Sequence, residues 1–190
     1  MPNLLKQIPE AMRKQGISEE IIAEFNISND ANSAEAVMAL ITQMDGLLSE
    51  EQCLAIMQEQ GCCKTGKPAA PHRAFGIEHA GKTLAEKVDL LNEANIPHKA
   101  PSRLNGDGTL SVYWGAENMK GRNCPCGFIK KLPDSFEVPK TFCGCCGGHI
   151  RSNYQKSLGV KLRLKEIVSS SSSSGGKKRC EFLFEIEGDK

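Results

Sequence analysis

The sequence predicts an α+β fold, in which a helical N-terminal half precedes a small antiparallel sheet. In the first half apolar residues recur at three- and four-residue steps, the period of a helix with one buried face. In the second half they alternate with polar residues, the period of a half-buried strand. A chain of 190 residues has room for one real core. We therefore expect a helical region over residues 1–82 and an α+β region over 83–190, packed as one compact unit.

Capping residues indicate where the helices of the first half begin and end. Ser18 precedes two acidic residues, and Ser49 and Thr83 each stand three residues before a Gln or Glu in the capping-box pattern. Gly61 and Pro97 are expected to end the last two helices, because glycine adopts left-handed conformations and proline cannot continue a helix. The expected helices cover residues 18–25, 33–48, 49–61 and 83–96, with a fifth over 4–15.

Three alternating segments are expected to form the sheet, at residues 110–114, 160–165 and 180–187. The outward face of segment 160–165 carries Lys and Arg, and the outward face of segment 180–187 carries Glu. Antiparallel pairing of these two segments as a closing β-hairpin sets opposite charges side by side, at a few tenths to about 1 kcal/mol per pair. The connecting serine run, residues 169–176, is expected to be a flexible tip because it is too polar to pack.

Charge and hydropathy exclude several classes of partner. With 24 basic and 23 acidic residues the net charge is +1, so neither nucleic acid nor an anionic membrane is an expected partner, and a small-molecule ligand is favoured. Apolar runs stay short of the roughly 20 residues of a membrane span, and the N-terminus lacks a secretory signal pattern. The expected location is cytoplasmic. Nine cysteines in that reducing compartment indicate metal ligation or thiol chemistry rather than a disulfide framework.

Six candidate ligands are concentrated in residues 121–149. They are Cys124, Cys126, Cys143, Cys145, Cys146 and His149. Thiolate sulfur and imidazole nitrogen are the ligands that tetrahedral zinc prefers, so we expect zinc here, with iron or an iron-sulfur cluster as the alternative. Six candidates exceed the four positions of such a site, and the spacing does not select among them.

A helix is expected from Gly148 to Leu158, ended by Gly159. Cys145 and Cys146 lie at its start, where unpaired backbone N–H groups and the helix dipole favour a thiolate. These two cysteines are the candidate catalytic nucleophiles. A metal-free redox or nucleophilic thiol site is the alternative to metal ligation.

The other cysteines fall into two groups. Cys62 and Cys63 are possible additional ligands, unless Cys62 packs as a small apolar residue and Cys63 is a spare thiol. Cys53 and Cys180 lie on the apolar faces of their own elements, so they are expected to be core residues.

Two resemblances extend this interpretation. The run Gly121-Arg-Asn-Cys-Pro-Cys-Gly, followed later by Cys145-Cys146, is similar to the SEC-C zinc motif, which implies one zinc held by Cys124, Cys126, Cys145 and Cys146. Over residues 84–186 the order of helices, cysteine-rich loop, helix and closing hairpin resembles the bacterial 4-vinyl reductase and aminothiazoline-carboxylate hydrolase-like domains. That resemblance implies a small-molecule-binding module with a cysteine-rich site.

The sequence thus predicts a zinc-binding domain that binds an unidentified small molecule. One alternative is a metal- or thiol-dependent hydrolase, with Cys145 or Cys146 as nucleophile. The other is a zinc module that contacts RNA or protein through nearby basic residues, which the neutral charge and scarcity of aromatic residues disfavour. Whether the protein is an enzyme is left open at this point.

Overall fold

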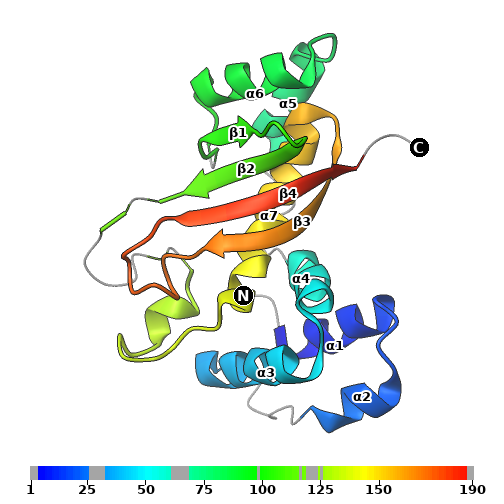
Figure 1. Ribbon diagram of the computed structural model, residues 1–190, viewed down its shortest axis with the longest axis vertical. Helices are drawn as coiled ribbons and strands as arrows, with labels where there is room; N and C mark the ends of the chain where they lie inside the picture. Colours follow the sequence, from blue (N-terminus) through cyan, green and yellow to red (C-terminus); the bar gives the residue numbers. More distant parts are fainter. Residues whose placement is uncertain are drawn as a thin grey trace.

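The computed structural model describes residues 4–25, 33–60, 69–97, 99–115, 117–118, 124 and 126–187. In these residues the chain forms seven α-helices, two short 3₁₀ helices and one four-stranded antiparallel sheet. Figure 1 shows α1 to α4 gathered at one end of the molecule, with α5 and α6 at the other and α7 running across the sheet between them. The predicted α+β class is confirmed.

Six helices precede the sheet: α1 (Leu4–Lys14), α2 (Glu19–Glu24), α3 (Ala34–Leu47), α4 (Glu50–Glu59), α5 (Ala69–Glu78) and α6 (Leu84–Glu93). Ser49 and Thr83 complete the predicted capping boxes of α4 and α6. Helix α5 is the one that the sequence does not predict, since it contains Pro71 and Gly76, which ordinarily interrupt helices. None of the helices in the described residues combines the length and apolar character needed to cross a bilayer.

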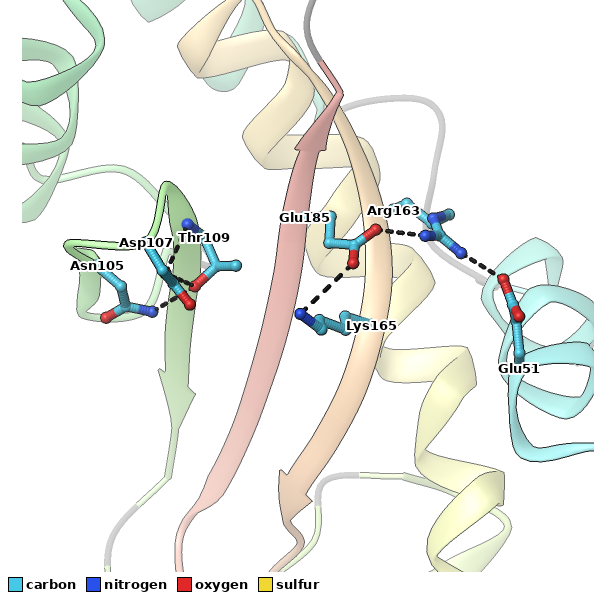
Figure 2. A network of polar contacts seen from close by, with 7 residues as sticks. All are labelled: Glu51, Asn105, Asp107, Thr109, Arg163, Lys165 and Glu185. Carbon is cyan, nitrogen blue, oxygen red and sulfur yellow. Dashed lines mark hydrogen bonds and ion pairs between the residues drawn. The ribbon is translucent and has the colours of Figure 1, made fainter.

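The sheet has the strand order β1-β2-β4-β3, formed by β1 (Ser102–Leu104), β2 (Thr109–Trp114), β3 (Lys161–Ser169) and β4 (Cys180–Glu187). Strands β3 and β4 are the predicted hairpin, with Arg163 opposite Glu185. Figure 2 shows Arg163 pairing with Glu185 on one side and with Glu51 of α4 on the other, while Lys165 reaches Glu185 at 3.5 Å. The charge pairing expected of the hairpin is confirmed.

Two hydrophobic cores meet at the start of helix α7 (Gly144–Leu158). The first core unites α1 to α4 with the segment around Phe128 and Phe142. The second lies between the sheet and α5 to α7, and includes Phe182 and Phe184 of β4 and Tyr154 of α7. The 3₁₀ helix η2 (Lys140–Cys143) leads directly into α7, and a second one, η1 (Ile129–Lys131), precedes it. The N-terminus of α7 therefore lies at the seam of the two cores.

The serine run between β3 and β4 packs into the structure, so the expectation that it is too polar to pack is wrong. Ser170, Ser171 and Ser172 are all buried, each at most 4% exposed. Their hydroxyl and backbone groups form hydrogen bonds within the turn and with two cysteines. Because those partners replace water, polarity does not prevent the run from packing.

Candidate functional site

Five cysteine side chains from three segments gather at the seam of the two cores. They are Cys124 and Cys126 from the connection between β2 and α7, Cys143 and Cys146 from the start of α7, and Cys180 from the start of β4. We call these five the thiol cluster. Cys146 lies within electrostatic range of the other four, since each of them raises the pKa of its thiol. Cys124 and Cys126 pack against the first core, and Cys146 and Cys180 against the second.

Ser170, Ser171 and Ser172 are buried beside this cluster and form hydrogen bonds with it. We call these three residues the serine turn. The sulfur of Cys143 lies 3.0 Å from the Ser170 hydroxyl and 3.2 Å from that of Ser172, and the two hydroxyls are 2.9 Å apart. The backbone N–H of Ser171 donates to the sulfur of Cys180 at 3.3 Å. One short turn thus holds thiols from two different elements.

Glycines bring the start of α7 into the seam. A Cβ at Gly144 would lie 2.7 Å from the Cβ of Met57 in α4, and one at Gly147 would lie 2.7 Å from Leu164 of β3. Real Cβ atoms do not approach other atoms so closely. The glycine-rich sequence around the cysteines therefore permits close packing of α7 against its neighbours, and that packing places the thiols between the two cores.

Burial is the main influence on the pKa values of Cys124, Cys143, Cys146 and Cys180. It raises the pKa of Cys143 and of Cys124 from 9.0 to about 11, and it raises the pKa values of Cys146 and Cys180 as well. At Cys143 the hydroxyls of Ser170 and Ser172 act in the opposite direction without overcoming burial. The expectation that the helix N-terminus makes Cys146 a thiolate is therefore wrong. With a pKa of about 11, only about one Cys143 in ten thousand is ionised at pH 7.

Two of the six predicted ligands do not join the cluster. Cys145 is buried in the first core, and its sulfur donates to the carbonyl oxygen of Gln60 at 3.5 Å. His149 has its Nε2 atom 3.3 Å from the side-chain nitrogen of Asn153, one turn further along α7. Neither residue is among the main groups that shift the pKa values of Cys124, Cys143, Cys146 and Cys180. Cys62 and Cys63 lie outside the described residues.

The predicted metal centre does not fit this geometry. Among the described residues, no group of three or more His, Cys, Asp and Glu side chains is arranged to hold a metal ion. Zinc requires about four donors directed at one centre, about 2.0–2.3 Å away, whereas Cys145 and His149 are directed elsewhere and Cys143 is bonded to serine hydroxyls. The prediction of zinc as cofactor, with iron or an iron-sulfur cluster as the alternative, is therefore wrong.

The predicted functions that depend on a bound metal are therefore wrong as well. A zinc-binding small-molecule domain, a metal-dependent hydrolase and a zinc module that contacts RNA or protein all require a ligand arrangement that the described residues do not form. The thiol-dependent hydrolase is not supported either. Cys145 is hydrogen-bonded within the first core, and burial raises the pKa of Cys146, so neither thiol is activated for repeated catalytic turnover.

Three residues of the site are not predicted as functional from the sequence. Cys180 is expected in the core and Ser170 and Ser172 in a mobile tip, yet all three surround the thiols. The signal that could identify them is the predicted hairpin. Its register pairs Ser169 with Glu181, which brings the serine run beside Cys180.

Comparisons with known proteins add little to this description. No protein-family profile matches the chain, and no curated protein sequence matches it. Two solved structures of an H-NOX protein from S. oneidensis are similar. A triple mutant in the Fe(II) state shares 9% identity at a TM-score of 0.37, and covers 100% of this chain and 98% of its own. The Fe(II)NO state shares 10% identity at a TM-score of 0.38, with coverages of 99% and 100%.

At these identities and TM-scores the two structures assign neither a fold family nor a ligand to this chain. The resemblance to 4-vinyl reductase and aminothiazoline-carboxylate hydrolase-like domains is not tested by them and stays a prediction. The chemistry of the site must therefore be inferred from its own residues.

Proposed function

We propose that the thiol cluster is a reversible dithiol–disulfide site, with Cys143 and Cys146 as the reacting pair, and that the protein responds through it to thiol-oxidising conditions. The main support for this proposal is the position of the two cysteines. Cys143 is the N-cap residue of α7 and Cys146 lies in its first turn, so the two form a C-x-x-C motif at the N-terminus of a helix. Dithiols of this spacing at helix N-termini are a recurrent arrangement for thiol–disulfide exchange.

The helical spacing supports formation of the bond. Residues three apart on a helix have Cβ atoms about 5–6 Å apart, and a disulfide needs about 3.5–4.5 Å. Cys143 has helical backbone angles, φ −67° and ψ −11°, so this spacing applies to the pair. A closing movement of roughly 1–2 Å is enough. Cys145, although between them in sequence, is directed at Gln60 instead.

The reaction that we propose is exchange with a small-molecule disulfide. The bond between the sulfurs of Cys143 and Cys146 forms, the S–S bond of the small molecule breaks, and two electrons pass from the cysteine pair to the small molecule. The two thiol protons end on the two released thiols. Because the thiolate is the attacking species, the raised pKa values make this exchange slow at pH 7. A reduced resting state is what the predicted cytoplasmic location requires.

The test is to equilibrate the full-length protein in glutathione buffers of increasing oxidised fraction and to locate disulfides by peptide mapping. We expect one disulfide between Cys143 and Cys146 that reduced glutathione reverses. Cys143→Ser and Cys146→Ser should each abolish it. Cys53→Ser is the matched control, because Cys53 is a buried thiol outside the cluster, and it should leave the disulfide unchanged. A wild-type protein that stays fully reduced, or that joins other cysteines, would refute the proposal.

A further inference from the structure

We propose that the hydroxyls of Ser170 and Ser172 activate Cys143 as the thiol that closes the disulfide, after Cys146 has formed the mixed disulfide with the small molecule. This inference rests on the dithiol function proposed above and assigns different tasks to the two cysteines. It also assigns a positioning role to the serine turn.

Accessibility sets the order of the two cysteines. Cys143 is buried, with 5% of its surface exposed, and its sulfur is enclosed by the serine turn. Cys146 is partly exposed at the edge of the second core. Within the reacting pair Cys146 is the less buried residue, so we assign it the first contact with the small-molecule disulfide and leave Cys143 to attack the sulfur of Cys146 from inside the protein.

The serine hydroxyls can stabilise the negative charge that this second attack requires. In the resting state each hydroxyl and the Cys143 thiol can exchange donor and acceptor roles. When the thiol loses its proton, both hydroxyls can donate to the sulfur, and such bonds to an ionised acceptor are stronger than neutral ones. Ser170 and Ser172 are only 2% and 3% exposed, so water competes little for these donors.

The neighbouring backbone prepares Ser170 for this role. The N–H of Ser173 donates to the Ser170 hydroxyl oxygen at 3.3 Å. With that oxygen already accepting a hydrogen bond, the hydroxyl hydrogen can be donated either to the sulfur of Cys143 or to the Ser172 hydroxyl. Rotation of the Ser170 hydroxyl is therefore enough to direct a donor toward the ionised sulfur.

Cys146 has a different environment. Burial and all four other members of the thiol cluster disfavour its ionised form, whereas at Cys143 the two hydroxyls favour ionisation. The serine turn thus assists Cys143 and not Cys146.

The steps balance as follows. Cys146 loses its proton and attacks the small-molecule disulfide, forming a mixed disulfide and releasing one thiolate, which takes up a proton. Cys143 then loses its proton and attacks the sulfur of Cys146, which forms the internal disulfide and releases the second thiolate, also protonated on leaving. The serine hydroxyls donate hydrogen bonds to the Cys143 sulfur once it is ionised, and they neither gain nor lose a proton overall.

The test uses Ser170→Ala and Ser172→Ala, singly and together, with glutathione disulfide as the probe. Rapid alkylation followed by mass spectrometry and peptide mapping follows the glutathione adduct on Cys146 and its conversion to the internal disulfide. We expect the adduct to form at the wild-type rate and ring closure to slow by about tenfold per hydroxyl removed. Ser173→Ala is the matched control, since Ser173 is an exposed residue whose hydroxyl donates to the Ser170 carbonyl and, among the described residues, makes no bond to a cysteine sulfur.

A pH profile separates activation from a merely structural role. Losing the hydroxyls should move the midpoint of the ring-closure rate to higher pH, which a loss of stability alone would not do. Melting temperatures of the single variants check that the turn still folds. If wild type forms the internal disulfide and the serine variants close it at the same rate and pH midpoint, this inference is wrong and the dithiol function stands. If wild type forms no such disulfide, the function itself fails, and an adduct that appears first on Cys143 overturns the order.

Discussion

Gly148 of α7 lies directly against the backbone carbonyl of Gln58 in α4, so closely that a Cβ at position 148 would come within 2.0 Å of the carbonyl oxygen. Both groups belong to helix backbones, and neither can rotate away as a side chain does. This contact therefore sets how near α7 comes to α4, and with it the place of the cysteines at the start of α7.

We expect Gly148→Ala to lower the free energy of unfolding by about 3 kcal/mol, because the added methyl forces the two helices apart. Gly46→Ala in α3 is the matched control, since a Cβ there meets nothing within 4 Å. That change should raise stability by up to about 1 kcal/mol through helix propensity. Urea denaturation of both variants measures the difference, and equal effects would contradict the close contact.

The open edge of β3 is covered by glutamine side chains. The backbone N–H of Leu164 donates to Gln58 at 3.1 Å, and that of Leu162 donates to Gln155 at 2.9 Å. Gln58 is buried and Gln155 is partly exposed. We expect Gln58→Ala to cost about 2 kcal/mol, because it leaves a buried N–H without its acceptor. Gln155→Ala should cost less than about 1 kcal/mol, because water can replace the side chain.

Hydrogen exchange provides the site-specific measurement for this edge. The amide of Leu164 should exchange faster in Gln58→Ala, and that of Leu162 faster in Gln155→Ala, with the other amide protected in each case. If both amides respond equally to either change, the edge is not held by individual glutamines.

Stability should fall in alkaline solution because of the buried thiols. The pKa of Cys143 is about 11 in the folded protein against an ordinary 9.0, so above about pH 9 the unfolded chain loses a proton that the folded chain keeps. The stabilisation is complete below pH 9 and is lost as pH rises through 11. Serine does not titrate in this range, so Cys143→Ser should show a shallower decline between pH 8.5 and 10.5 in urea denaturation. An identical decline would show that Cys143 is not protected by burial.

Glu185 should be the most important residue of the network in Figure 2, because it pairs with both Arg163 and Lys165. Glu51 pairs with Arg163 alone, and its side chain is 77% exposed. We expect Glu51→Gln to change the free energy of unfolding by less than about 0.5 kcal/mol, and Glu185→Gln to cost up to about 1 kcal/mol. Denaturation at low and high salt checks this, since only the second effect should shrink clearly with added salt.

Local signals account for the elements that the sequence predicts correctly. The capping boxes at Ser49 and Thr83 are satisfied within one helical turn, and the hairpin of β3 and β4 follows from alternation and opposite charges. Strand β1 depends on support from a neighbouring helix instead. The side chain of Asn92 in α6 bonds to both the N–H and the carbonyl of Ser102, which supports a strand of only three residues.

The amino-acid sequence by itself determined the α+β class, most helix starts, the hairpin and the segment in which the reactive residues concentrate, because each depends on residues close together in the chain. Only the tertiary structure decided which cysteines share a site. Successive residues on a helix differ by about 100° around its axis, so Cys145 faces the first core while Cys146 faces the second. Cys180 and the serine turn then reach the same seam through strand register. Packing of α7 between two cores, which no local pattern encodes, selected the members of the thiol cluster.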